Sequence, residues 1–336
     1  MRIGVIGMGS WGTALATHWA TEGHRVTLWG RRPELVATVA GERRNTAYLP
    51  GVDLPDELAF TDRLADLVDA EAAVVVVPSH GFRDAVRRFL AQVPDDGRRR
   101  LLVSATKGIE TEGLARMSEV TAEEAEAAGR PVDFAVLTGP TFAAELVRGS
   151  PTAAVLACED RALAEHAQRA LSGSTLRLYS STDVVGVEVG GTSKNVIAIA
   201  AGIIAGLGLG HNTVAALLTR GLHEITRLGI ACGGEPRTLS GLAGMGDLVL
   251  TCTGDLSRNR RLGVELASGK SSQEATGATP MVAEGFRNSL AVARLAEAKG
   301  VEMPITEQMV EILHHGKPPR QAIAELMGRE LRAEVE

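Results

Sequence analysis

The sequence is poor in aromatic residues and in cysteine, and each shortage excludes a class of protein. Only 3% of its 336 residues are aromatic, so a surface that stacks nucleic-acid bases is not expected. The formal net charge of −6 also argues against a nucleic-acid partner and against an anionic membrane surface. Cys158, Cys232 and Cys252 form an odd set without metal-ligand spacing, which predicts no metal site and suits a reducing compartment.

The sequence also lacks a signal-peptide pattern and a convincing membrane-spanning run. Residues 1–4 lead directly into a strand pattern, without the charged and apolar regions of a leader. The uncharged helical run over residues 195–210 is too short and too rich in glycine for a membrane span. We therefore expect a cytoplasmic protein without membrane insertion.

The pattern of the chain changes near its middle, from strand-rich to helix-rich. At this length two domains are the default, and the change predicts a domain over residues 1–183 and an all-α domain over 184–336. Continuous apolar runs at 72–78, 101–107 and 134–138 are typical of a central sheet covered on both faces. The N-terminal domain is therefore predicted to be an α/β, Rossmann-type doubly wound fold, whose ligands lie beyond the carboxyl ends of its strands.

A glycine-rich turn follows the first predicted strand and opens a helix. Gly7, Gly9 and Gly12 match the G-x-G-x-x-G pattern. In this context the glycines allow a tight turn, close approach of a pyrophosphate, and close packing of helix on strand. Such turns also merely join strands to helices, but the position after a first strand favours a dinucleotide site.

The end of the second predicted strand indicates which dinucleotide is bound. Arg31 and Arg32 lie where a site for NAD usually has an acidic residue. Guanidinium groups can pair with the 2′-phosphate of NADP, which a carboxylate would repel. NADPH is therefore favoured, with NADH as an alternative, unless both arginines are simply solvated.

Lys194 lies beside a long stretch without charge, residues 196–209. A cation there is costly to desolvate unless it has a partner or a function, so we expect it at a cleft between the two halves. The alternative is a lysine at a helix end that extends its ammonium group to water.

A second dense stretch, residues 241–261, combines glycines with polar and charged side chains. Asp247 stands among glycines that allow another group to approach closely. Ser257, Arg258 and Asn259 offer donors suited to a phosphate dianion, although such a run is also typical of an ordinary solvated face.

Six stretches of the chain form a recognisable set, residues 7–15, 45–51, 104–110, 139–145, 190–197 and 241–263. Together they resemble the NAD(P)-dependent glycerol-3-phosphate dehydrogenases of bacterial type. Met8 and His211 depart mildly from the family pattern. The resemblance implies a reversible reduction of dihydroxyacetone phosphate to sn-glycerol 3-phosphate, which supplies glycerophospholipid synthesis.

The resemblance also assigns site residues by position. It places the catalytic lysine at Lys194, with Lys107 and Asp247 as the charged groups beside it. Substrate contacts are implied for Lys107, Gly139, Thr141, Lys194, Asp247, Ser257, Arg258 and Asn259. Cofactor contacts are implied for Ser10, Trp11, Arg31, Lys107, Ala143, Arg258, Val282 and Glu284. We add Arg32 because of its positive charge, and Gly7, Gly9 and Gly12 because they form the glycine-rich turn.

The chemistry of these residues fits such a reaction. Hydride delivered to a ketone carbon leaves negative charge on the oxygen, which a neighbouring cation or acid must stabilise. Lys194 is suited to that role, Lys107 could share it, and Asp247 would orient either Lys194 or a substrate hydroxyl. Arg258 and Asn259 would hold the substrate phosphate away from the reacting carbon.

Two other functions stay open from the sequence alone. One is a β-hydroxyacid dehydrogenase of the same architecture, although such enzymes usually carry an asparagine one turn after the lysine, whereas Asn195 is adjacent. The other is a dinucleotide sensor without catalysis, which would not need lysine, aspartate and arginine together. Glycine- and alanine-rich helices further suggest a homodimer.

Overall fold

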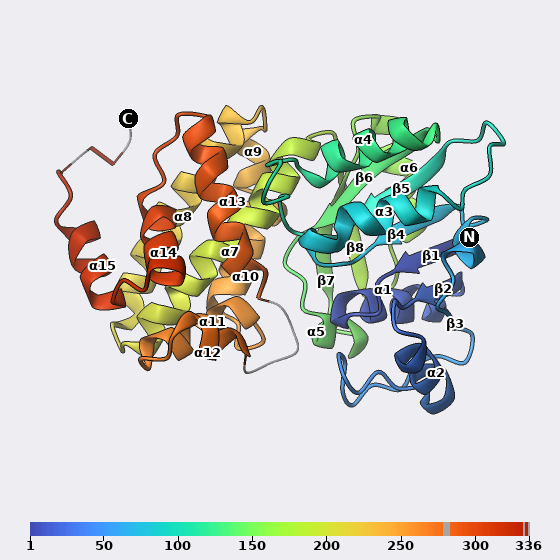
Figure 1. The fold of residues 1–336 in the computed structure, drawn as a ribbon, viewed down its shortest axis with the longest axis horizontal. Coiled ribbons are helices and arrows are strands. Elements are labelled where there is room, and N and C mark those ends of the chain that lie inside the picture. The colour runs from blue at the N-terminus through green and yellow to red at the C-terminus, as the bar shows by residue number, and fades with distance from the viewer. Residues whose placement is uncertain (278–282, 332, 335–336) are drawn as a thin grey trace.

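The structure is a computed structural model that describes residues 1–277, 283–331 and 333–334. A sheet-containing half and a helical half lie side by side along the longest axis of the molecule (Figure 1). The last strand ends at Ser181 and the first long helix of the second half begins at Val184. The predicted division at 183/184 falls in this short connection.

The first half is built on one eight-stranded sheet, in the order β3-β2-β1-β4-β5-β6-β7-β8. The first six strands run parallel, whereas β7 pairs antiparallel with β6 and parallel with β8. This arrangement confirms the Rossmann-type prediction. The strands are β1 (Arg2–Ile6), β2 (Arg25–Trp29), β3 (Ala59–Thr61), β4 (Ala72–Val75), β5 (Arg100–Ser104), β6 (Val132–Thr138), β7 (Thr152–Ala157) and β8 (Leu176–Ser181).

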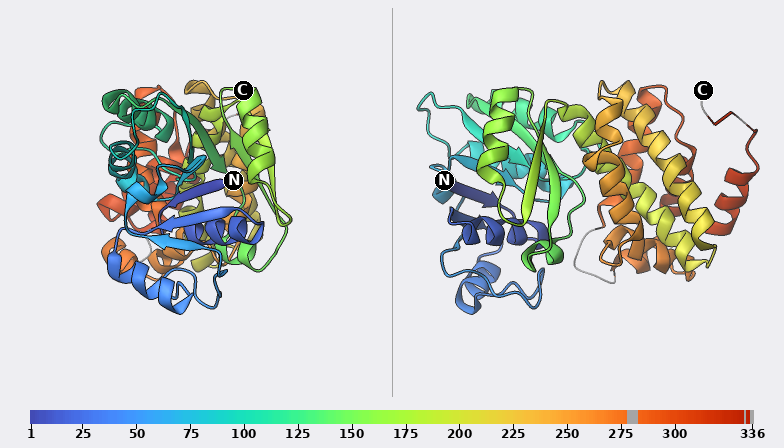
Figure 2. Two further views of the ribbon diagram at one scale, coloured as in Figure 1. Left: turned by 90° about the vertical axis from the view of Figure 1, so that its right-hand side faces the viewer. Right: turned by 180° about the vertical axis from the view of Figure 1, so that it is seen from behind.

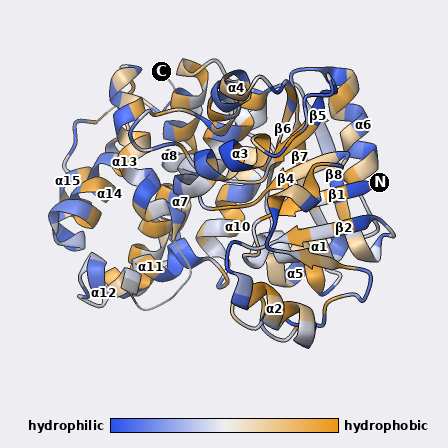
Figure 3. Ribbon diagram, turned by 45° about the vertical axis from the view of Figure 1, so that its right-hand side comes forward, coloured by the Kyte–Doolittle hydropathy of each residue, from blue (hydrophilic) through white to orange (hydrophobic). Residues whose placement is uncertain are grey.

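Helices cover both faces of this sheet, because successive strand residues point to opposite sides. Val74 of β4 joins the core beneath α1 and α6, whereas its neighbour Val75 joins the core beneath α3 and α4. Figure 3 shows hydrophobic colour along the strands around β4. The helices are α1 (Ser10–Thr21), α2 (Pro33–Glu42), α3 (Phe82–Leu90), α4 (Met117–Ala128), α5 (Ala143–Val147) and α6 (Arg161–Leu171), with short 3₁₀ turns η1 (Leu64–Leu67) and η2 (Ser79–Gly81).

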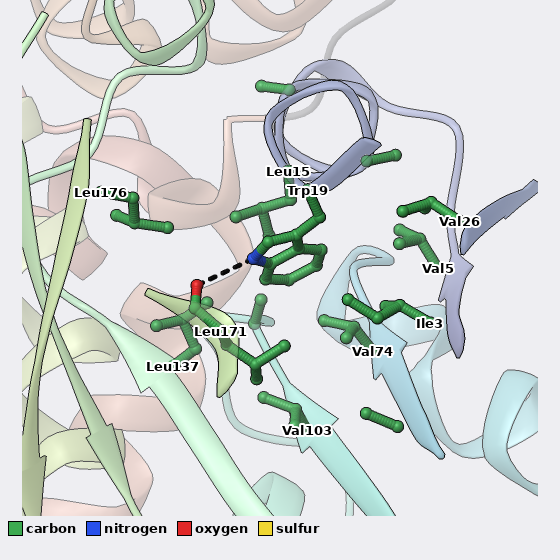
Figure 4. Packing of buried hydrophobic residues seen from close by; sticks show 14 of the residues in the cluster. Ile3, Val5, Leu15, Trp19, Val26, Val74, Val103, Leu137, Leu171 and Leu176 are labelled. Carbon is green, nitrogen blue, oxygen red and sulfur yellow. Dashed lines mark hydrogen bonds between the residues drawn. The ribbon is translucent and has the colours of Figure 1, made fainter. Parts of the chain in front are cut away.

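Trp19 links two of these helices inside the first core. Its indole Nε1 donates to the carbonyl oxygen of Leu171 at 2.9 Å, which joins α1 to the end of α6 (Figure 4). The ring is fully buried among side chains of several strands. A buried indole N–H needs such a partner, so this bond fixes α1 against the end of α6.

The second half is helical throughout the part of it that the structure describes. Helix α7 is buried along almost its whole length beneath the other helices (Figure 2). The helices are α7 (Val184–Gly206), α8 (Gly210–Ala231), α9 (Pro236–Leu239), α10 (Asp247–Thr253), α11 (Arg258–Ala267), α12 (Ser272–Gly277), α13 (Glu284–Ala298), α14 (Pro304–His315) and α15 (Pro319–Met327), with a π-helical turn η3 (Leu242–Gly246) before α10.

Helix α7 corrects one expectation drawn from length. It begins well before the uncharged run, and by length and composition it would be able to cross a membrane. However, 89% of its most apolar window is buried inside the protein, as in the core helix of a folded domain. Burial, and not insufficient length, therefore distinguishes α7 from a membrane span.

Candidate active site

Three charged side chains from distant parts of the chain meet where the two halves adjoin. Lys194 Nζ lies 2.8 Å from Asp247 Oδ1, and Lys107 Nζ lies 2.6 Å from Asp247 Oδ2. The Lys194 ammonium also donates to Thr251 Oγ1 at 2.6 Å. Because the Lys194 side chain is only 7% exposed, the alternative of an ammonium group extended to water is wrong.

Close packing of η3 on α7 brings Asp247 to Lys194. The sequence had suggested a lysine at the end of an apolar helix, but Lys194 lies in the middle of α7. Gly190, one turn earlier on the same face, meets η3, and a Cβ there would lie 2.9 Å from the carbonyl oxygen of Ala243. Asp247 follows η3 directly as the first residue of α10, and Thr251 comes one turn later. The absence of a side chain at Gly190 therefore lets Lys194 and Asp247 form their ion pair.

Lys107 reaches the same carboxylate from the carboxyl end of β5. Its ammonium group donates to the carbonyl oxygen of Gly139 at 2.9 Å and lies 3.4 Å from Thr141 Oγ1. Gly139 and Thr141 follow the neighbouring strand β6. Two strand ends of the first half thus converge on Asp247 of the second half, as the rule for doubly wound sheets predicts for a ligand site.

Burial and mutual attraction set the protonation of this cluster. Burial lowers the pKa of Lys107 to about 8, with repulsion from Lys194 adding to the effect and Asp247 opposing it. Burial would by itself raise the pKa of Asp247, but the two ammonium groups hold it below its usual range. Asp247 is therefore a carboxylate at neutral pH, and Lys107 titrates close to the physiological range.

The glycine-rich turn between β1 and α1 leaves room for a phosphate group. Gly7 has φ +129°, and a Cβ there would lie 2.4 Å from the carbonyl oxygen of Val76. A Cβ at Gly12 would lie 1.9 Å from the carbonyl oxygen of Gly7. At Gly9, by contrast, a Cβ would meet no atom of the described residues within 4 Å apart from its chain neighbours. The turn is therefore tight on its inner side and open where a pyrophosphate would approach the start of α1.

Ser10 and Trp11 form the first turn of α1 above this open side. The Ser10 hydroxyl donates to the carbonyl oxygen of Tyr48 at 2.5 Å. Arg32 donates to the hydroxyl of the same tyrosine at 3.0 Å and also lies over its ring, 5.8 Å from the centroid. The exposed Arg31 precedes Arg32 in the same loop. A cationic loop thus stands beside the glycine turn, with Tyr48 holding one of its two arginines.

The N-terminus of α11 faces the glycine turn from the other half. Ser257 caps the helix by accepting from the backbone N–H of Arg260 at 3.2 Å. Arg258 donates to Ser10 Oγ at 3.2 Å, across the boundary between the halves. Asn259 is buried, donates to Asn195 Oδ1 at 2.9 Å and accepts from the N–H of Gly285 at 3.0 Å. Among these three residues, Arg258 reaches furthest toward the first half.

The remaining predicted cofactor residues lie at helix starts or outside the described residues. Ala143 is the first residue of α5, and Glu284 is the first residue of α13. The Glu284 carboxylate accepts from Ser79 Oγ at 2.8 Å and from Ser79 N at 3.3 Å. Burial raises the Glu284 pKa, and these bonds oppose that shift. Val282 lies outside the described residues.

Sequence reasoning missed four neighbours of the predicted site. Thr251 could have been found from its spacing, because it stands one helical turn after Asp247. Tyr48 and Asn195 fall within stretches that carry the family resemblance, and Ser79 follows a buried strand. Their partners, however, depend on contacts between segments far apart in the sequence, which no local pattern shows.

Two family models match the chain and together span most of it. The model of the NAD-dependent glycerol-3-phosphate dehydrogenase N-terminus matches residues 2–164, and that of the C-terminus matches residues 183–324. Among curated relatives, the glycerol-3-phosphate dehydrogenase (NAD(P)+) of Geobacter sp. strain M21 is 49% identical over 334 residues, 99% of this chain and 98% of the relative. That of Corynebacterium diphtheriae is 47% identical over 336 residues, 99% of this chain and 100% of the relative.

A solved structure agrees with these relatives over nearly the whole chain. The 2.1 Å crystal structure of glycerol-3-phosphate dehydrogenase from Coxiella burnetii has a TM-score of 0.92 and 40% sequence identity. The match covers 98% of this chain and 99% of that one.

Proposed function

Because the chain belongs to the NAD-dependent glycerol-3-phosphate dehydrogenase family, we propose that it catalyses the reversible reduction of dihydroxyacetone phosphate to sn-glycerol 3-phosphate. The observation that carries this proposal is the contact of Lys107 and Lys194 with one buried carboxylate, Asp247. This cluster lies where the dinucleotide-type half and the helical half meet. The product is a precursor of glycerophospholipids, so the reaction supplies lipid synthesis.

The residues of the first half fit a nicotinamide dinucleotide. NADPH or NADH supplies the hydride when it is bound. The open side of Gly9 and the start of α1 would hold the pyrophosphate, and Arg258 would contact it from the other half. Arg31 and Arg32 would pair with a 2′-phosphate, which favours NADPH over NADH.

The lysines act on the substrate carbonyl oxygen. Negative charge develops on this oxygen during reduction, and an ammonium group held without bulk water stabilises it strongly. Lys194 donates the proton to that oxygen, and in the reverse direction it accepts the proton from the hydroxyl. Asp247 and Thr251 hold the Lys194 ammonium in place, and Lys107 adds a second positive charge.

The substrate phosphate is held at a distance from this carbonyl. The N-terminus of α11 presents backbone N–H groups with Ser257 as its cap and Arg258 as a charged donor. Asn259 keeps this helix start against α7 and α13 through its two hydrogen bonds. Gly139 and Thr141 would contact the substrate beside Lys107. Binding the phosphate remotely orients the ketone for reduction.

Initial rates of NADPH and NADH oxidation test this function directly. We expect rapid oxidation with dihydroxyacetone phosphate, a higher kcat/KM with NADPH than with NADH, and negligible rates with a panel of β-keto acids. Turnover with the β-keto acids alone would contradict the proposed substrate. Cofactor binding without turnover of any of these substrates would support a sensor instead.

We further propose that the chain forms a homodimer and works in the cytoplasm. Several apolar side chains of the helical half are more than 40% exposed, among them Ile230, Met245 and Val249, and they suit an interface. The three free cysteines suit a reducing compartment. A monomeric mass by light scattering would refute the dimer, and recovery outside the cytoplasmic fraction would refute the location.

A further inference from the structure

Helix α13 attaches the helical half to the strand ends that carry the site. Near its start Glu284 binds Ser79 after β4, and towards its end Arg294 donates to the carbonyl oxygen of Thr111 at 2.8 Å. Between them Asn288 Nδ2 donates to the carbonyl oxygen of Lys107 at 3.1 Å. Helix α13 thus contacts the backbone of Lys107, whose ammonium group binds Asp247.

Packing alone does not explain an asparagine at position 288. The side chain is fully buried, and its Oδ1 has no hydrogen-bond partner among the residues that the structure describes. A buried amide oxygen without a partner destabilises the folded state, whereas an apolar side chain of similar size would avoid that cost. The bond from Nδ2 to Lys107 is the contact that an apolar side chain could not make.

This bond acts where the chain leaves the sheet. The two residues before Lys107 are fixed to the end of β4 and to the segment that follows it, because Ala105 N donates to Val75 O at 2.9 Å and Thr106 Oγ1 donates to Val77 O at 2.7 Å. After Lys107, Gly108 packs so closely on Ser79 that a Cβ there would lie 2.4 Å from the serine Cβ. Asn288 therefore fixes the Lys107 carbonyl three residues beyond the end of β5, at the residue whose side chain extends to Asp247.

We propose that Asn288 is a positioning residue that holds Lys107 in register with Asp247 from helix α13. The proposal rests on the proposed function of Lys107 at the substrate oxygen. Without the bond, the peptide that follows Lys107 can rotate, and its ammonium group leaves Asp247 and Gly139. Misplacement of this kind lowers the rate without removing any group that touches the substrate.

A double-mutant cycle separates this role from a general structural one. Asn288→Ala is expected to lower kcat/KM for dihydroxyacetone phosphate about tenfold in the wild-type background, the size of one good hydrogen bond. In the Lys107→Ala background the same change should have almost no further effect, because the residue it positions is gone. Equal losses in both backgrounds would contradict the proposal.

Two further variants guard against a folding defect. Ser289→Ala is the matched control, because Ser289 is the next residue of α13 and is buried. Among the residues that the structure describes, its hydroxyl bonds within the helical half, to Phe286 and His314. Its effect should be the same in both backgrounds. In Asn288→Thr the side chain fills most of the asparagine volume, but its hydroxyl bonds within its own helix instead of to Lys107. This variant should therefore lower kcat/KM only when Lys107 is present, as expected for Asn288→Ala, even if Asn288→Ala does not fold.

A titration without substrate tests Asn288 independently of the reaction. The side-chain NMR signal of labelled Lys107 should titrate near pH 8 in the wild type and closer to the ordinary lysine value in Asn288→Thr. It should stay unchanged in Ser289→Ala. Failure to reduce dihydroxyacetone phosphate would contradict the proposed function, whereas an unchanged Lys107 titration in Asn288→Thr would contradict the role of Asn288 alone.

Discussion

Two lysines share one carboxylate in this site, so the three groups act as a unit. Asp247 is almost completely buried and binds both Lys107 and Lys194 at hydrogen-bonding distance. Removing Asp247 would leave two poorly solvated cations facing each other, which is strongly destabilising. With Asp247 present, the cluster still holds more positive than negative charge. That excess is what a developing oxyanion requires.

The low pKa of Lys107 predicts a pH dependence for the reduction. Its ammonium group is charged below pH 8 and loses its proton as the pH rises through its pKa of about 8. We therefore expect kcat/KM for dihydroxyacetone phosphate to be constant at lower pH and to fall above about pH 8. In Lys107→Arg the fall should disappear, although the rate is lower, because arginine keeps its charge throughout this range.

The pH profile of kcat/KM, measured for both enzymes between pH 6 and about pH 10, checks this assignment. Lys270→Arg is a suitable control, because Lys270 pairs with Glu265 on the surface of the helical half and its side chain is 49% exposed. This control should keep the wild-type profile. A fall near pH 8 that persists in Lys107→Arg would assign the titration to another group.

The sequence identified all three charged residues but not how they meet. Lys194 was conspicuous because a cation beside a long apolar run needs a partner, and Asp247 because it stands among glycines. Asp247 is 53 residues from Lys194 and 140 residues from Lys107 in the sequence, so no spacing rule connects it to either lysine. For the same reason the sequence could not choose the group that Asp247 orients. The structure shows that it binds both lysines.

Helix α7 carries Lys194, and its small residues let another helix cross it closely. A Cβ at Gly202 would lie 1.9 Å from the carbonyl oxygen of Arg260, and a Cβ at Gly263 of α11 would lie 2.0 Å from that of Ile199. Backbone therefore touches backbone at this crossing. The crossing fixes α11, whose start carries Ser257 and Arg258, relative to Lys194.

The crossing predicts that Gly202→Ala is destabilising. The added methyl group has no space, so α7 and α11 must separate, which costs about 1–3 kcal/mol in the free energy of unfolding. Gly41→Ala in α2 is the matched control, because a Cβ there would meet no atom within 4 Å in the described part of the chain. It should be neutral or stabilise by up to about 1 kcal/mol, as alanine favours helix. Urea denaturation measures both, and equal effects would contradict the close crossing.

At the scale of elements, long patterns were predicted well and short ones were not. The buried parallel strands and α7 follow from continuous apolar runs. Strand β3 has three residues, too few for a periodic pattern, and it is recognised as a strand by its pairing with β2. The π-helical turn η3 packs against α7 at Gly190, and the local sequence of η3 does not indicate this contact.

The whole molecule places complementary parts of one site on its two halves. The sheet-containing half offers the glycine turn, the arginine loop and Lys107, whereas the helical half offers Lys194, Asp247 and the start of α11 (Figure 1). Hydrogen bonds from Arg258 to Ser10 and from Ser79 to Glu284 join the halves on either side of the site. Neither half contains the site alone, so its chemistry depends on how the halves are held together.

The proposed proton transfer by Lys194 is tested most directly by one variant. Turnover of dihydroxyacetone phosphate is measured for Lys194→Ala and the wild type at saturating NADPH, together with the dissociation constant of NADPH from its fluorescence. If Lys194 is the proton donor, kcat falls by at least ~10² in Lys194→Ala while NADPH binding is unchanged. Turnover at the wild-type rate would contradict it.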